Sequence, residues 1–220
     1  MEIWDCLRSP AAAAAMNMAV DHALLRFAAT RSRPLLRLYT WRQPALSYGY
    51  FQKFPAQFVG QYEIVRRPTG GGLVYHGNDT TYTVVIPPGH ALYRLSTNDA
   101  YQAIHRAVAA ALTAQAELVR QARAPRGQYE CFQNPVAGDV VAGNQKLAGG
   151  AQRRGRGGVL HQGSIARHVD ADRLMASFRS AFGIEFVAYT LTSAEQAEAD
   201  RLCREKYATV NSLPASPLSQ

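Results

Sequence analysis

The sequence predicts an α+β fold in which helices flank a largely antiparallel central sheet. Segments of β type gather in the middle of the chain, between residues 35 and 165, while helical patterns lie before, between and after them. A Gly-Arg-Gly-Gly stretch at 155–158 joins two of the strand-like segments as a hairpin would. We expect one domain over residues 1–212 and a flexible tail, rich in Ser and Pro, over 213–220.

In the first part of the chain, the helix comes before the strands. Ser9 before Pro10 is a typical helix start, and good helix formers then continue over 11–27. Segments rich in β-branched and aromatic residues follow, with Pro and Gly between them. The strands expected from this pattern cover residues 35–41, 45–50, 62–67, 73–76 and 80–86.

In the second part, strands lie between helices. Ser96 and Thr97 offer a cap for a long helix that runs to about Arg120. The strands expected after it cover residues 130–132, 139–142, 146–153 and 159–165. Two further helices are expected over 170–182 and 193–207.

The composition limits which partners, and which metal or disulfide sites, can be expected. A formal charge of +8 favours a negatively charged partner, but basic and aromatic residues do not interleave as in a nucleic-acid surface. Three scattered cysteines, without zinc-type spacing, predict neither a disulfide framework nor a metal site. The alanine run at 11–15 is flanked by charged and polar residues, so we expect no signal peptide or membrane span and a cytoplasmic location.

The most informative motif is Arg-Arg-Pro-Thr-Gly-Gly-Gly-Leu-Val-Tyr-His at 66–76. Three consecutive glycines allow positive φ and let a ligand lie against main-chain N–H groups, which suits a carboxylate or a phosphate. A tight turn without a ligand is the alternative. The neighbouring arginines favour an anion, and if they lie on a strand, Arg66 and Arg67 point to opposite faces. His76 leaves the next strand close enough to donate a hydrogen bond to the same pocket.

A second motif is Lys-Leu-Ala-Gly-Gly-Ala-Gln-Arg at 146–153, followed by Leu-His-Gln-Gly-Ser-Ile at 160–165. A lysine that enters a run of small residues can place its ammonium in a confined cleft, where it stabilises negative charge far better than in water. An exposed lysine at a strand end is the alternative for Lys146.

Together these motifs resemble the biotin/lipoate A/B protein ligase family, especially its lipoate-protein ligases and cysteine-dependent octanoyltransferases. The resemblance extends from about Met18 to Tyr207, and it includes an opening-helix pattern at 17–21 and a closing Lys-Tyr-Ala-Thr at 206–209. It implies the catalytic-domain fold of that family and the transfer of a lipoyl or octanoyl group to a lysine of a carrier protein.

The resemblance also implies roles for individual residues. Lys146 matches the lysine that contacts the acyl carbonyl and the leaving group. The glycine loop would hold the acyl group, with Arg67 near its carboxyl or phosphate end. The full set of substrate-binding residues expected is Arg67, Thr69, Gly70, Gly71, Gly72, His76, Gly149, His161 and Gly163.

Two catalytic routes remain open within this family. Cys131 precedes Lys146 by 15 residues, which resembles the octanoyltransferases that carry octanoate on a cysteine thioester. Two departures count against this route: Gly-Gly-Gly-Leu stands where that branch has Gly-Gly-Arg-Ala, and an acidic Tyr-Glu-Leu pattern is missing after Cys131. The alternative is an ATP-dependent ligase that forms lipoyl-AMP, with an accessory subunit in place of the family's small C-terminal domain. A non-catalytic acyl- or biotin-binding module is the third reading.

The expected cofactors and partners depend on which of the two catalytic routes the enzyme uses. A transferase needs no cofactor, whereas a ligase needs ATP and magnesium. The expected acceptor is an acidic lipoyl domain or a carrier like the glycine-cleavage H protein, and the expected donor for the transferase is an acyl carrier protein. The basic charge of the chain agrees with acidic carriers.

Overall fold

The computed structural model describes residues 1–120 and 135–208, and its centre is a sheet of eight strands. The order across this sheet is β11-β1-β2-β6-β10-β9-β8-β7. The strands of this sheet are β1 (Glu2–Arg8), β2 (Leu35–Tyr39), β6 (Thr80–Ile86), β7 (Glu117–Leu118), β8 (Val140–Ala142), β9 (Gln145–Gly155), β10 (Gly158–Ile165) and β11 (Ile184–Ala188). Only the β11–β1 and β1–β2 pairs are parallel, so the predicted α+β fold with a largely antiparallel sheet is confirmed.

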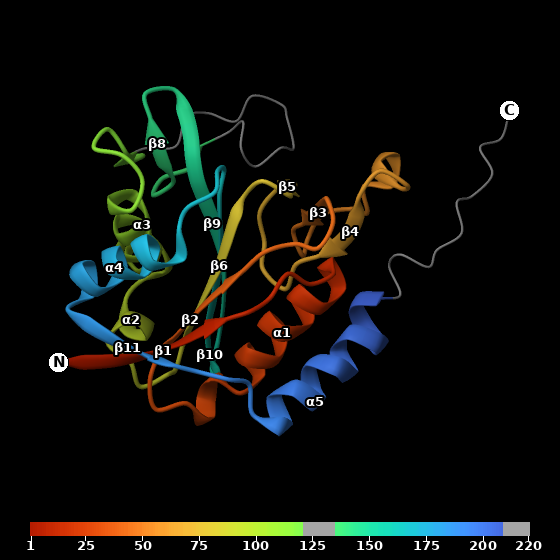
Figure 1. Cartoon of the computed structure of the whole chain (residues 1–220), viewed down its shortest axis with the longest axis horizontal. Coiled ribbons are helices and arrows are strands. Elements are labelled where there is room, and N and C mark those ends of the chain that lie inside the picture. The colour runs from red at the N-terminus through yellow and green to blue at the C-terminus, as the bar shows by residue number, and fades with distance from the viewer. Residues whose placement is uncertain (121–134, 209–220) are drawn as a thin grey trace, which may run out of the picture.

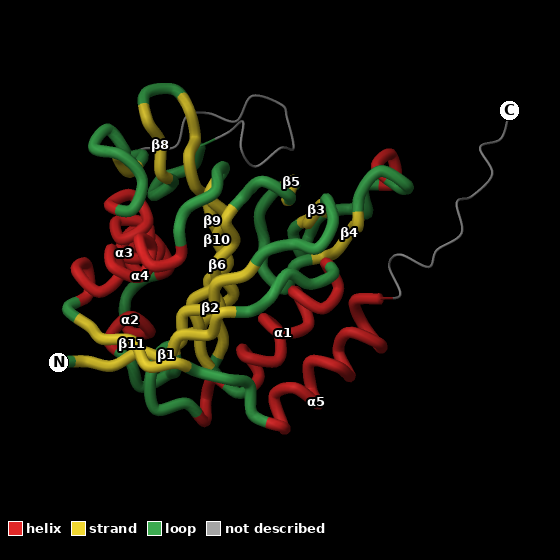
Figure 2. The backbone as a smooth tube through the Cα atoms, viewed as in Figure 1, coloured by secondary structure: helices red, strands yellow, loops and turns green. Residues whose placement is uncertain are grey.

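Helices cover both faces of this sheet, as Figures 1 and 2 show. On one face lie α1 (Ala14–Arg26) and α5 (Ser193–Leu202), which continues into a π-helical turn, η3 (Cys203–Tyr207). The other face is covered by α3 (Thr97–Ala110) and α4 (Ala171–Phe182). The alternation along β6 matches this layering, because Val84 packs in the α3/α4 core and Val85 in the α1/α5 core.

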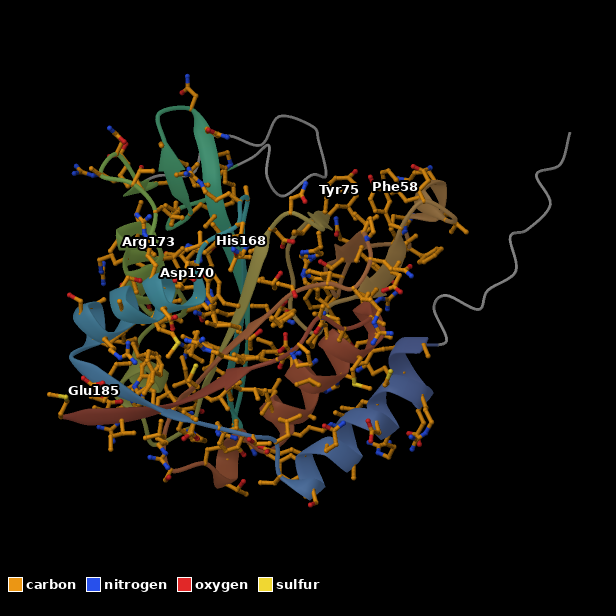
Figure 3. The ribbon with its side chains drawn as sticks, in the orientation of Figure 1. Phe58, Tyr75, His168, Asp170, Arg173 and Glu185 are labelled. Carbon is orange, nitrogen blue, oxygen red and sulfur yellow. The ribbon has the colours of Figure 1, made fainter. Side chains whose placement is uncertain are left out.

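A second, three-stranded sheet lies beside the start of α1 and forms one side of the site described below (Figure 1). Its order is β4-β3-β5, with β3 (Ala45–Tyr48) between β4 (Glu63–Arg66) and β5 (Val74–His76). Aromatic rings support its outer side: Tyr75 contacts Phe58, and the two side chains lie next to each other in Figure 3. Phe58 belongs to a short 3₁₀ turn, η2 (Ala56–Phe58).

The predicted start of the first helix is wrong. The helix begins at Ala14, its N-cap Ala13 makes no side-chain cap, and Ser9 instead accepts a hydrogen bond from Arg37 at 2.9 Å. Ser9 and Pro10 therefore belong to the connection from β1. Arg37 is buried, and its guanidinium uses the Ser9 hydroxyl as a hydrogen-bond acceptor. This tertiary contact outweighs the local signal for Ser9 as a helix cap.

Other predicted helix and strand boundaries either agree with the structure or differ from it. Ser96 caps α3 as predicted, but this helix ends at Ala110 instead of about Arg120. Within the range predicted to be helical, Glu117–Leu118 form strand β7, which pairs with β8. Asp170 caps α4, and Gly183 ends it with φ of 65°. The edge strand β11 was not predicted. The expected strand at 130–132 and the expected tail at 213–220 lie outside the described residues.

Four short helical elements lie in the connections between the larger ones or at their ends. They are the 3₁₀ turn η1 (Ala28–Thr30), η2, the helical turn α2 (Ala91–Arg94) and η3. Within residues 1–120 and 135–208, no helix combines the length and the apolar character that crossing a bilayer requires.

Candidate active site

A narrow cavity lies between the large sheet and the small sheet. Its empty space is about 450 Å³ counted to its opening, yet the centre of a water molecule can move through only about 30 Å³ of it, so it is a slot. Its wall consists of Met18, Tyr39, Trp41, Ser47, Arg67, Gly71, Val74, His76, Thr81, Gly149, Gly150, Ala151, Gln162, Gly163 and Ser164. Both sequence motifs therefore contribute to one narrow cavity.

The glycine loop forms one wall of this cavity and is held by Arg67. The Arg67 guanidinium donates to the carbonyl oxygens of Gly70 at 3.0 Å and Gly72 at 2.7 Å, and to the backbone and hydroxyl oxygens of Ser47. Gly71 has φ of 90°, a conformation that favours glycine. Arg66 points the other way and is exposed, which confirms that the two arginines face opposite sides.

Ser47, His76 and Asp79 form a buried chain of hydrogen bonds beside this loop. Asp79 accepts from His76 Nδ1 at 2.6 Å, so Nε2 accepts from the Ser47 hydroxyl, also at 2.6 Å. Burial lowers the pKa of His76 despite the opposing effect of Asp79. Burial alone would raise the pKa of Asp79, but hydrogen bonds from His76, Gly77 and Ser164 together hold it below its usual value. The pair is therefore a neutral imidazole beside a carboxylate.

The connectivity of this chain is that of a Ser-His-Asp triad, but its chemistry differs. Arg67 donates to the Ser47 hydroxyl oxygen, which lowers the electron density that a nucleophile needs. The imidazole is a weak base because of its lowered pKa, and it stacks on Trp41 with ring centroids 3.9 Å apart. The chain thus fixes the wall of the cavity, since it joins β3, β5 and the start of β6.

A second buried network connects helix α1 to the glycine loop. Asp21 in α1 pairs with Arg37 at 2.7 Å and accepts from the Gln162 amide at 2.7 Å. The Gln162 oxygen in turn accepts from the Thr69 hydroxyl at 2.7 Å. Because every partner is buried and satisfied, the network fixes Gln162 in the cavity wall and Thr69 behind the loop.

Lys146 is buried and lies directly against the cavity wall. Its ammonium pairs with Asp139 at 2.7 Å, and Asp139 also accepts from Tyr101 at 2.6 Å and from the Val136 backbone N–H at 2.7 Å. A side chain on Gly149 would meet the Lys146 ammonium at 2.7 Å, so the missing side chain lets the ammonium approach the wall. Lys146 is thus a positioned, charged group, and the reading of an exposed strand-end lysine is wrong.

His161 lies behind the wall, in a cluster with His105 and Tyr101. Its ring is completely buried against Gly150, and burial, followed by the nearby His105, lowers its pKa well below the usual value. A neutral His161 supports β9 from behind, and a direct contact with substrate stays a prediction. Gly163 lies in the wall itself, where a side chain would collide with the Tyr82 ring.

The structure therefore brings most of the predicted site residues together. Arg67, Gly71, His76, Gly149 and Gly163 line the cavity. Thr69, Gly70 and Gly72 hold the loop in place, while Lys146 and His161 contact the wall from behind. Cys131 lies outside the described residues.

Sequence reasoning missed the partners that orient these residues. Asp139, Tyr101 and Ser47 were not predicted, because no spacing connects them to the motifs. Gln162 stands inside the quoted Leu-His-Gln-Gly-Ser-Ile motif, so its buried position could have been suspected from its neighbours.

Comparison with known proteins finds one matching family. Residues 13–193 match the family described as the lipoyl protein ligase A/B catalytic domain. The chain is 36% identical over 196 residues to octanoyltransferase LipM of Kyrpidia tusciae, an alignment that covers 81% of this chain and 71% of that protein.

Solved structures show the same fold. A T. acidophilum protein described as a lipoate protein ligase superposes with a TM-score of 0.76 at 22% identity, covering 94% of this chain and 97% of that one. A lipoate-protein ligase A bound with ATP superposes with a TM-score of 0.74 at 23% identity, covering 94% and 96%. Identities this low support the architecture alone.

Proposed function

Since this chain belongs to the lipoyl protein ligase A/B catalytic-domain family, we propose that it is the enzyme that transfers an octanoyl or lipoyl group to one lysine of a lipoyl-carrier protein. The observation that carries this proposal is the shared cavity: the glycine loop and β9 line one narrow slot, and the Lys146 ammonium lies against its wall. A slot of this shape suits a medium-length acyl chain, and the ammonium suits the charge that develops on its carbonyl oxygen.

Lys146 acts as the electrostatic donor in this proposal. When the amine of the carrier lysine attacks the acyl carbonyl, negative charge develops on the carbonyl oxygen. Asp139 and the bonds that hold it fix the ammonium before the reaction begins, so little reorganisation is needed. Gly149 keeps the distance between ammonium and cavity short.

Cys131 is the proposed acyl carrier of the transferase route. Its thiolate attacks the octanoyl thioester of an acyl carrier protein, releases the carrier thiol and forms an octanoyl thioester on the enzyme. The target amine then attacks this thioester, loses a proton, forms the amide and frees the Cys131 thiol. The identity to a protein named octanoyltransferase and the position of Cys131 before Lys146 support this route.

Octanoyl acyl carrier protein, mixed with the enzyme in the absence of acceptor, should leave one octanoyl group on Cys131. The adduct should be visible by intact mass and should be released by neutral hydroxylamine, because a thioester reacts with it far faster than an oxygen ester. Cys131→Ser should form no such adduct and should lose most of the transfer activity, since a serine hydroxyl has no comparable anionic form near neutral pH.

Two outcomes would contradict the Cys131 route. A hydroxylamine-resistant adduct that maps to Ser47 would assign the nucleophile to the Ser47–His76–Asp79 chain instead. A fully active Cys131→Ser variant, together with a bound acyl-adenylate formed from lipoate and ATP, would establish the ligase route.

Cofactor, partners and location complete the proposal. The transferase route needs no nucleotide, whereas the ligase alternative uses ATP and magnesium. The acceptor is an acidic lipoyl domain or an H-type carrier, the donor is an acyl carrier protein, and the enzyme works in the cytoplasm. An inactive protein that still binds octanoate would instead support a non-catalytic acyl-binding module.

A further inference from the structure

A second depression, the basic groove, lies next to the cavity. It is formed by the ends of β3 and β4 and by the η3 turn, and its lining includes Tyr48, Tyr50, Arg66, Pro68, Lys206 and Tyr207. About 290 Å³ of it is open to the centres of water molecules, so it holds more open space than the cavity. Arg67 lines both, and the groove is therefore a direct neighbour of the acyl site.

Three cations lie over the aromatic rings of this groove. Arg66 lies over Tyr48 at 5.2 Å from the ring centroid, and Lys206 lies over Tyr207 at 5.7 Å. Arg153 lies over Tyr50 at 5.6 Å and donates to the Pro68 carbonyl at 3.4 Å, which places it at the groove. Tyr48 and Tyr207 are also almost completely buried, so their rings offer little surface for stacking a nucleotide base.

The groove concentrates positive charge. Within residues 1–120 and 135–208, neither Arg66 nor Arg153 forms an ion pair with a carboxylate. Burial, then Arg153, Arg26 and Arg66, lower the pKa of Lys206. Burial, then Lys206, Arg26 and Arg153, lower the pKa of the neighbouring His22 to about 4, although Glu198 opposes this shift. Such a concentration of like charge opposes folding and favours an anionic partner.

An exposed aromatic residue indicates that the partner is a protein. Phe51 is 90% exposed, and its ring packs edge-on against Tyr50 with centroids 5.1 Å apart. An exposed ring beside a charged groove is typical of a protein interface, in which an aromatic anchor is surrounded by polar contacts. A small anion would gain nothing from Phe51.

We propose that the basic groove and Phe51 dock the acidic surface of the carrier domain that accepts the acyl group. This inference rests on the proposed function, and it names the acceptor because both the transferase and the ligase route must bring the target lysine to the cavity. Complementary charge would raise the encounter rate and fix the orientation of the carrier beside the cavity.

Binding of an apo lipoyl domain of net negative charge, measured by titration calorimetry without an acyl donor, tests this docking site. The double variant Arg66→Glu/Arg153→Glu should weaken binding on the order of tenfold or more, because each reversal replaces an attraction with a repulsion. Added salt should weaken binding of the wild-type protein and have less effect on the double variant. Phe51→Ala should weaken binding at every salt concentration.

Arg106→Glu is the matched control, because Arg106 is exposed on α3, which covers the opposite face of the large sheet. Equal affinities for the control and the double variant would overturn the proposal. So would a double variant that loses binding only to octanoyl acyl carrier protein, since the groove would then serve the donor. Docking is measured without turnover, so the two proposals can fail separately. A protein that binds the domain through this groove but transfers no acyl group would refute the proposed function and leave the docking site standing.

Discussion

Lys146→Ala should reduce acyl transfer on the order of a hundredfold or more, because it removes the charged group that we propose as the donor to the developing oxyanion. The loss should appear in kcat at saturating donor and acceptor, since the interaction strengthens in the transition state. Single-turnover transfer to an apo lipoyl domain, followed by mass spectrometry, measures it directly. A folded Lys146→Ala enzyme with wild-type turnover would contradict the assigned role.

Stability must be separated from catalysis in this experiment. Removing one partner of a buried ion pair leaves Asp139 unpaired, at a cost of about 3–5 kcal/mol. Lys146→Met/Asp139→Asn removes both charges and is the control for that cost. Gly149→Ala keeps both charges, but its new methyl group would lie 2.6 Å from the Lys146 Cε and must displace a flexible side chain. We expect it to fold normally and to lose transfer activity.

Gly71→Val should strongly weaken binding of the acyl group, while Gly70→Val changes it little. Gly71 has φ of 90°, and a Cβ there would lie 3.3 Å from the Arg67 guanidinium, at the cavity wall. A β-branched residue both resists this φ, at a cost of about 1–3 kcal/mol, and fills the slot. Gly70, its immediate neighbour, has no atom within 4 Å of the added Cβ and lies outside the positive-φ region.

Calorimetric titration with octanoate, with a thermal melt of each variant, measures this difference. We expect the affinity of Gly71→Val to fall at least about tenfold, with Gly70→Val close to wild type. Equal binding by the two variants would mean that the loop is a turn without contact to the ligand.

Parts of the site could be predicted from sequence where a local backbone requirement determines which residue types occur at neighbouring positions. The run 70–72 shows this, because Gly71 at its centre has a positive φ that favours glycine. Lys146 was found for a similar reason, since Gly149, one of the small residues that follow it in sequence, also lies against its side chain. The opposite directions of Arg66 and Arg67 followed from strand geometry alone.

Features that depend on distant contacts could not be predicted. Asp139 approaches Lys146 only because β8 pairs with β9, with an irregular register at Val140 and Val141. Met18 and Trp41 reach the cavity through the packing of α1 and the crossing from the large sheet to the small one. Arg67 was expected to contact the ligand's acid group, and its observed contacts hold the loop's own carbonyl oxygens. Its contact with the ligand stays a prediction.

The most direct test of the proposed function is the mass of an apo lipoyl domain after incubation with this protein and octanoyl acyl carrier protein, without nucleotide. We expect one octanoyl group per domain, attached to a single lysine, and no product when that lysine is replaced by arginine. A parallel incubation with lipoate, ATP and magnesium identifies the ligase route. An unchanged mass of the lipoyl domain in both incubations, with folded and octanoate-binding protein, would contradict the assignment of acyl transfer to this cavity.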